Sequence, residues 1–225
     1  MDSWEKADSI EWRFYDSNAE AALSRRKLPH IDMPESLTFV TFRLADSMPA
    51  KVVRQWRDEI DQWLNDHGLI GHDVKSILAD PSVDEELKQD FLRFKHRRWH
   101  QKLDACFGAC ELRRPEVRKI VVDSLRHFNG QRYDLERFVI MPNHVHVLIQ
   151  VRRGYLLRKL FREIQRFSAR HINSMLGRSG ELWQGEPFDH VVRSPEQFDY
   201  LQGYIDNNPL KAKLRDGEFT LWRRA

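Results

Sequence analysis

The stretch that most constrains this chain is YDLERFVIMPNHVHVLIQV, residues 133–151. It contains two apolar, β-prone runs joined by Pro142-Asn143, a pattern typical of a β-hairpin. In a strand, side chains two residues apart point to the same face. His144 and His146 therefore share one face of the second strand. The other face is apolar and is formed by Val145, Val147, Ile149 and Val151.

The remaining patterns predict how the hairpin is completed into a domain. A β-prone run occupies residues 36–45, and helical patterns follow within 46–114. Beyond the hairpin come a long amphipathic helix at 156–176, a short strand at 188–193 and a helix at 194–209. This order predicts an α+β fold of ferredoxin-like type, an antiparallel sheet with helices packed on one face. We expect one domain, residues 1–225, with a helical insertion at about 46–114.

The last helix has marked end signals. Ser194 and Gln197 form an S-x-x-Q box around Pro195, which favours a helix start. Pro209 predicts the end of this helix, because proline disfavours a helical residue before it.

Composition excludes several classes of protein. With 225 residues, 41% of them hydrophobic, the chain can bury a core and is not expected to be disordered. The formal charge of +3 is compatible with nucleic-acid binding without requiring it. No apolar run is long enough to cross a membrane, and the N-terminus lacks a signal-peptide pattern, so we expect a cytoplasmic protein without membrane contact. The spacing of Cys106 and Cys110 suits neither a redox pair nor a zinc knuckle.

Two groups of residues are candidates for chemistry. His144 and His146 lie about 7 Å apart along a strand and could converge on one metal ion, or they could be two hydrogen-bonded histidines. Two ligands are too few, so a metal would need a third. Tyr204 and Asn208 share a helical face, and a tyrosine can act as a nucleophile while an amide oxygen can bind a metal. Alternatively, Tyr204 belongs to the core and Asn208 caps the helix.

Four segments carry a resemblance to a known family: RRKLPHI, TFVTFRLADSMP, ERFVIMPNHVHVLIQ and LWQGEPFDHVVRSPEQFDYLQGYIDNNPLKAKL. Together they resemble the REP-associated tyrosine transposases, a branch of the HUH superfamily of single-strand DNA transposases. The resemblance implies an HUH palm and a transposase-like catalytic domain. It implies an endonuclease and strand transferase that acts on hairpin (REP-type) DNA through a 5′-phosphotyrosine.

The resemblance also implies roles for individual residues. His144 and His146 would hold a divalent metal ion, Mg²⁺ or Mn²⁺, and Tyr204 would be the nucleophile. Asn208 would be the third ligand, at a position where related transposases have glutamine.

Two basic groups could bind DNA. Arginines recur every fourth residue on the predicted helix at 156–176: Arg158, Arg162, Arg166 and Arg170. They could form a solvated helix face, but the resemblance favours a surface that follows phosphates. A second basic cluster near the N-terminus is a candidate reader of sequence beside the hairpin and comprises Arg25, Arg26, Lys27 and His30. The expected partner is single-stranded hairpin DNA, bound by a monomer or homodimer. The alternatives are a noncatalytic single-strand nucleic-acid-binding module and a metal-dependent phosphohydrolase that uses water.

Overall fold

A computed structural model gives the structure of this chain and describes residues 10–16, 22–25, 29–32 and 35–225. Contacts group the chain into two compact units, which we describe separately. The sheet unit comprises Met1–Ala45 and Cys110–Ala225, and the helical unit comprises Asp46–Ala109.

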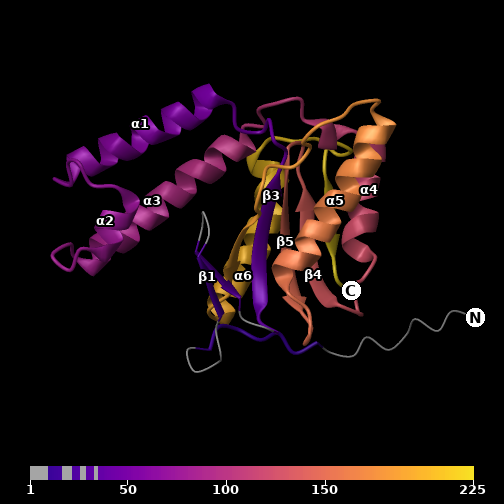
Figure 1. Ribbon diagram of the computed structural model, residues 1–225, viewed down its shortest axis with the longest axis horizontal. Coiled ribbons are helices and arrows are strands. Elements are labelled where there is room, and N and C mark those ends of the chain that lie inside the picture. The colour runs from indigo at the N-terminus through magenta and orange to yellow at the C-terminus, as the bar shows by residue number, and fades with distance from the viewer. Residues whose placement is uncertain (1–9, 17–21, 26–28, 33–34) are drawn as a thin grey trace, which may run out of the picture. The chain divides into compact units, whose positions relative to one another are not determined.

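The sheet unit is built on an antiparallel five-stranded sheet, which confirms the predicted α+β class (Figure 1). In sheet order the strands are β6 (Phe188–Val191), β3 (Leu37–Arg43), β5 (His144–Val151), β4 (Tyr133–Ile140) and β7 (Thr220–Arg223). The sequence did not predict β7, a four-residue strand that is held by pairing with β4. Two further short strands, β1 (Ala22–Arg25) and β2 (Pro29–Asp32), pair only with each other.

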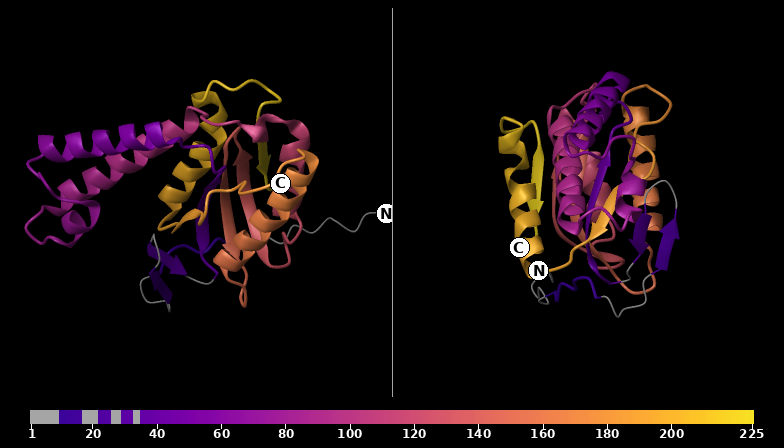
Figure 2. Two further views of the ribbon diagram at one scale, coloured as in Figure 1. Left: turned by 45° about the horizontal axis from the view of Figure 1, so that its top comes forward. Right: turned by 90° about the vertical axis from the view of Figure 1, so that its left-hand side faces the viewer.

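Helices cover both faces of this sheet, not the one face expected from the sequence. The Val145–Val147 face packs in an apolar core with α4 (Pro115–Arg126) and α5 (Leu157–Met175). The opposite face, which carries Leu148, packs against α6 (Pro195–Lys211). Figure 2 shows α5 and α6 on opposite sides of the sheet. Every residue of β5 is buried as a consequence.

The hairpin holds its histidines in a fixed register. In β5, His144 pairs with Arg43 and His146 pairs with Thr41 of the neighbouring strand. The turn is closed by a backbone hydrogen bond of 2.8 Å from Met141 N–H to His144 O. The Asn143 carbonyl accepts from Leu44 N–H at 2.9 Å, which ties the turn to the end of β3.

Helix α6 begins as predicted but ends later. The Ser194 side chain accepts a hydrogen bond from the Gln197 backbone at 3.2 Å, so it caps the helix. Pro209 lies inside the helix, which continues to Lys211, so the predicted end at Pro209 is wrong. Pro209 is buried, and its packing in the last turn outweighs the single backbone bond that proline removes.

The helical unit has a core of its own. Its helices are α1 (Ala50–Asp66), α2 (Val74–Ala79) and α3 (Glu85–Asp104). Ile60, Ile77 and Phe91 are among its buried side chains. Lys102 pairs with Glu59 at 2.6 Å across α1 and α3. None of the helices within the described residues combines the length and apolarity needed to cross a membrane.

Candidate active site

The two histidines of β5 point to the same side of the sheet and meet at their tips. His144 Nε2 and His146 Nε2 are 3.0 Å apart, and both residues are fully buried. Two nitrogen atoms that bind one ion at about 2.0–2.1 Å lie about 2.9 Å apart when the angle at the ion is 90°. The separation of the imidazoles fits two ligands of a single metal ion, and it also fits a direct hydrogen bond between the two rings.

The other nitrogen of each imidazole is held by a polar neighbour. His144 Nδ1 lies 2.7 Å from Asn143 Oδ1, and His146 Nδ1 lies 2.8 Å from Thr41 Oγ1. An amide oxygen can only accept, so His144 Nδ1 carries the proton and its Nε2 keeps a lone pair. Such outer contacts orient metal-binding histidines. Asn143 and Thr41 thus hold the rings with Nε2 directed at the shared point.

Burial keeps His144 in its uncharged form. Removal from water lowers the pKa of His144 to about 3, and the positive charge of Arg43 acts in the same direction. A neutral imidazole is the form that binds metal. His144 is therefore a competent ligand at neutral pH without first losing a proton.

Tyr204 of α6 reaches this pair from the helix above the sheet. Its hydroxyl lies 3.4 Å from His146 Nε2, and the two rings are 5.2 Å apart at their centroids. The Phe39 ring contacts both, edge-on to Tyr204 and stacked on His146. Tyr200, one turn earlier, is 68% exposed. Of the two tyrosines of α6, Tyr204 is the one whose hydroxyl contacts the histidine pair.

The direction of α6 across the sheet follows from its contacts. Near the start of the helix, the Phe198 ring lies 6.4 Å from Trp12. The segment that contains Trp12 donates a backbone hydrogen bond of 2.7 Å to Gln150, near the end of β5. Further along the helix, Tyr204 reaches His146, near the start of β5. Helix α6 therefore advances from the end of β5 toward its start.

Asn208 lies one turn beyond Tyr204 in this direction, which is toward His144. It is fully buried, and within the described part of the chain neither Oδ1 nor Nδ2 has a hydrogen-bond partner. A buried amide without partners is destabilising and therefore indicates an absent one. The alternative role as helix cap is wrong, because the C-cap of α6 is Ala212. Two imidazole nitrogens and an amide oxygen are a donor set that fits a divalent ion such as Mn²⁺.

Residues 113–208 match the model for IS200-like transposases. The match covers less than half of the chain, so it gives a similarity of this segment to that family. The matched residues include His144, His146, Tyr204 and Asn208. Lys211 and the whole helical unit lie outside the match.

Two solved structures are similar to this chain at low identity. One is a REP-associated tyrosine transposase bound to a REP hairpin, with 13% identity over 83% of this chain and 74% of that chain and a TM-score of 0.42. The other is a provisionally assigned transposase from Deinococcus radiodurans R1, with 14% identity over 82% of this chain and 96% of that chain and a TM-score of 0.35. The comparison with curated protein sequences gives no match.

The arginines of α5 singled out in the sequence lie away from the histidine pair. The arginines of α5 are exposed on the outer side of that helix, across the sheet from α6: Arg158, Arg162, Arg166 and Arg170. Arg25 ends β1, while Arg26 and Lys27 fall outside the described residues. The structure therefore does not bring the arginines of α5 together with Tyr204.

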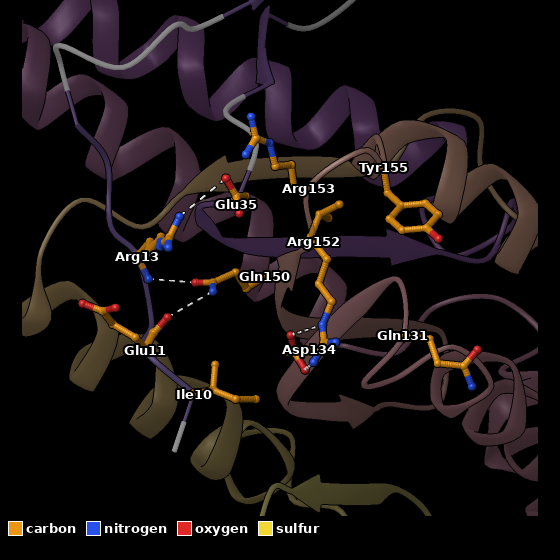
Figure 3. A pocket seen from close by; sticks show the side chains of 11 residues that line it. Ile10, Glu11, Arg13, Glu35, Gln131, Asp134, Gln150, Arg152, Arg153 and Tyr155 are labelled. Carbon is orange, nitrogen blue, oxygen red and sulfur yellow. Dashed lines mark hydrogen bonds and ion pairs between the residues drawn. The ribbon is translucent and has the colours of Figure 1, made fainter. Parts of the chain in front are cut away.

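A pocket of about 490 Å³ lies at the opposite end of the strands from His144 (Figure 3). Its lining alternates in charge: Arg152 pairs with Asp134 at 2.7 Å, and Arg13 pairs with Glu35 at 3.5 Å. Arg153 and Glu11 add one further charge of each sign, so this pocket offers no concentrated charge of one sign to a ligand.

Sequence patterns missed the residues that orient the histidine pair. Asn143 stands beside His144 in the turn, so the hairpin motif itself contained that signal. Thr41 is 105 residues away from His146 along the chain. Only the pairing register of β3 with β5 brings them together, and no local pattern could have revealed it.

Proposed function

We propose that this chain is a metal-dependent single-strand DNA endonuclease and strand transferase in which Tyr204 is the nucleophile. The observation that carries the proposal is the 3.4 Å contact between the Tyr204 hydroxyl and His146 Nε2, at the point where the two imidazoles meet. A phenol placed beside a buried pair of potential metal ligands is suited to attack on a phosphodiester. Hairpin DNA of the REP type is the substrate that the sequence resemblance implies.

His144, His146 and Asn208 would hold the divalent ion, Mg²⁺ or Mn²⁺. When bound, such an ion neutralises charge on a nonbridging phosphate oxygen and orients the phosphodiester. Two features support this ligand set. His144 is buried in its neutral form, and the Asn208 amide has no protein partner among the described residues.

The reaction follows from the position of Tyr204. Its oxygen forms a bond to phosphorus while the bond from phosphorus to the 3′ oxygen breaks. The phenolic proton that is lost is balanced by the proton that the 3′ oxygen gains. DNA remains attached through a 5′-phosphotyrosine, and attack by another 3′-hydroxyl reverses the step and transfers the strand. Phe39, packed against both rings, fixes the phenol relative to His146.

The arginines of α5 would hold DNA remote from the cleaved bond. Four cations one turn apart match a phosphate backbone, and they are exposed. Their place across the sheet from α6 means that they would act on affinity and not on the chemical step.

The test is trapping of a covalent adduct on a denaturing gel, using a labelled single-stranded hairpin with Mn²⁺ or Mg²⁺. We expect the wild-type protein and Tyr200→Phe to form the adduct. Tyr204→Phe should form none while its affinity for the hairpin stays within about threefold, because only the nucleophile is lost.

The other outcomes identify the alternatives. An adduct with Tyr204→Phe would show that the nucleophile is misassigned. Cleavage by the wild-type protein without any trapped adduct would indicate a hydrolase that uses water. Binding without cleavage would indicate a noncatalytic binding module.

A further inference from the structure

Lys211 is placed beside Tyr204 by the last turns of α6. Its Nζ lies 5.3 Å from the centroid of the Tyr204 ring. The two residues are seven apart, which is two helical turns and brings them to the same face. Lys211 therefore puts a positive charge next to the phenol that the proposed function uses as nucleophile.

The charge of Lys211 is available to a ligand. The residue is exposed, and among the residues the structure describes no carboxylate forms an ion pair with it. The carboxylate of Asp206, the acidic residue of the same turns, is engaged by Arg137 at 2.7 Å and Arg223 at 3.0 Å. Among the described residues Lys211 is thus a cation without a paired carboxylate, and its Nζ lies over the face of the Tyr204 ring.

A basic residue in the last turn could simply satisfy the end of the helix. The backbone already does this here. The carbonyl of Asn208 accepts from Ala212 N–H at 3.1 Å, and that of Pro209 accepts from Leu214 N–H at 3.0 Å. Because these carbonyls have backbone partners, capping does not require the Lys211 side chain.

We propose that Lys211 binds a nonbridging oxygen of the phosphodiester that Tyr204 attacks. This inference rests on the proposed function. Negative charge grows on the phosphoryl oxygens as the new bond to phosphorus forms, and a preorganised cation stabilises it. His146 contacts the phenol from the buried side, with His144 beside it, whereas Lys211 is exposed. The phosphate would be held between the buried ligand set and Lys211.

The first experiment measures the single-turnover rate of adduct formation at saturating hairpin DNA. Lys211→Gln should be slower than wild type by roughly 100-fold, as for loss of one preorganised donor, with hairpin affinity within a few-fold. Lys211→Arg should stay within about tenfold of wild type, because it keeps the charge. Lys213→Gln is the matched control, since it removes the same charge two residues away and should leave the rate unchanged.

A second experiment tests contact with the phosphate itself. The scissile linkage is made as each of its two phosphorothioate isomers, in which sulfur replaces one nonbridging oxygen. For the isomer with sulfur facing Lys211, the ratio of wild-type to Lys211→Gln rates should fall below about tenfold, while the other isomer keeps the full ratio. The metal-dependent preference for one isomer is common to both proteins and cancels in this comparison.

These outcomes separate the inference from the function on which it rests. Equal rates for wild type and Lys211→Gln, or an equal loss with Lys213→Gln, would overturn the role of Lys211 while leaving Tyr204 in place. The same holds if both isomers keep the full ratio. A wild-type protein that binds the hairpin and never forms the adduct would instead overturn the proposed function.

Discussion

The two faces of β5 differ in what they contribute. One face, with Val145 and Val147, packs into the apolar core beneath α4 and α5. The other carries His144 and His146, equally buried, but facing α6 and held by polar neighbours. One strand can thus supply stability with one face and the proposed metal ligands with the other. Substitutions on the two sides should therefore have different consequences.

The largest effect is expected in the apolar core. Phe161 is fully buried and packs edge-on against Phe42 at 5.6 Å. Phe161→Ala should lower the free energy of unfolding by roughly 3–5 kcal/mol, because it leaves a cavity. Denaturant unfolding measures this. At a temperature where the variant is folded, its affinity for Mn²⁺ should match that of the wild type. A large loss of Mn²⁺ affinity would show that the two faces of β5 do not act independently.

A smaller effect, of a different kind, is expected beside the histidines. Asn143→Ala removes the group that orients His144, and removal of such an outer partner typically weakens metal binding by about 10- to 100-fold. Isothermal titration with Mn²⁺ measures the affinity of the unmodified and altered proteins. Asn129→Ala, at an amide that binds the Leu135 backbone instead, is the control and should leave metal affinity unchanged. If Asn143→Ala binds Mn²⁺ with unchanged affinity, Asn143 does not orient a metal ligand.

At Asn208 the proposed role as metal ligand and the stability of the fold make opposite demands on the side chain. Asn208→Leu replaces a buried amide that lacks partners within the described chain, so it should raise the free energy of unfolding by about 1–2 kcal/mol. Without metal, thermal unfolding should show this gain, while Mn²⁺ should stabilise the variant less than wild type. A loss of stability in metal-free buffer would mean that the amide is satisfied by the protein.

The smallest effect concerns the outer side of α5. Arg162→Ala combined with Arg166→Ala should flatten the dependence of hairpin affinity on salt. The log–log slope should fall by roughly 0.7 for each phosphate that these arginines no longer neutralise. Fluorescence anisotropy at several salt concentrations measures the slope. The rate of adduct formation by DNA that is already bound should not change. An unchanged slope would show that these arginines form an ordinary solvated helix face that does not contact DNA phosphates.

Much of the candidate site could be predicted from local periodicity. The two-residue repeat of a strand puts His144 and His146 on one face whatever surrounds them. The spacing of a helix does the same for Tyr204 and Asn208. End signals predicted the start of α6 at Ser194, but not its end, because packing around Pro209 overrides the local preference.

Only the tertiary structure decided which of these faces meet. A repeat along the chain fixes relative orientation within one element, but the face of a sheet that a helix covers depends on long-range packing. That packing brings the Tyr204 hydroxyl to His146, pairs Thr41 with the same ring, and separates α5 from both. It also leaves Lys211 over the Tyr204 ring, an arrangement set by where α6 ends and not by any motif. The sequence by itself thus determined the candidate groups, and long-range packing determined their assembly.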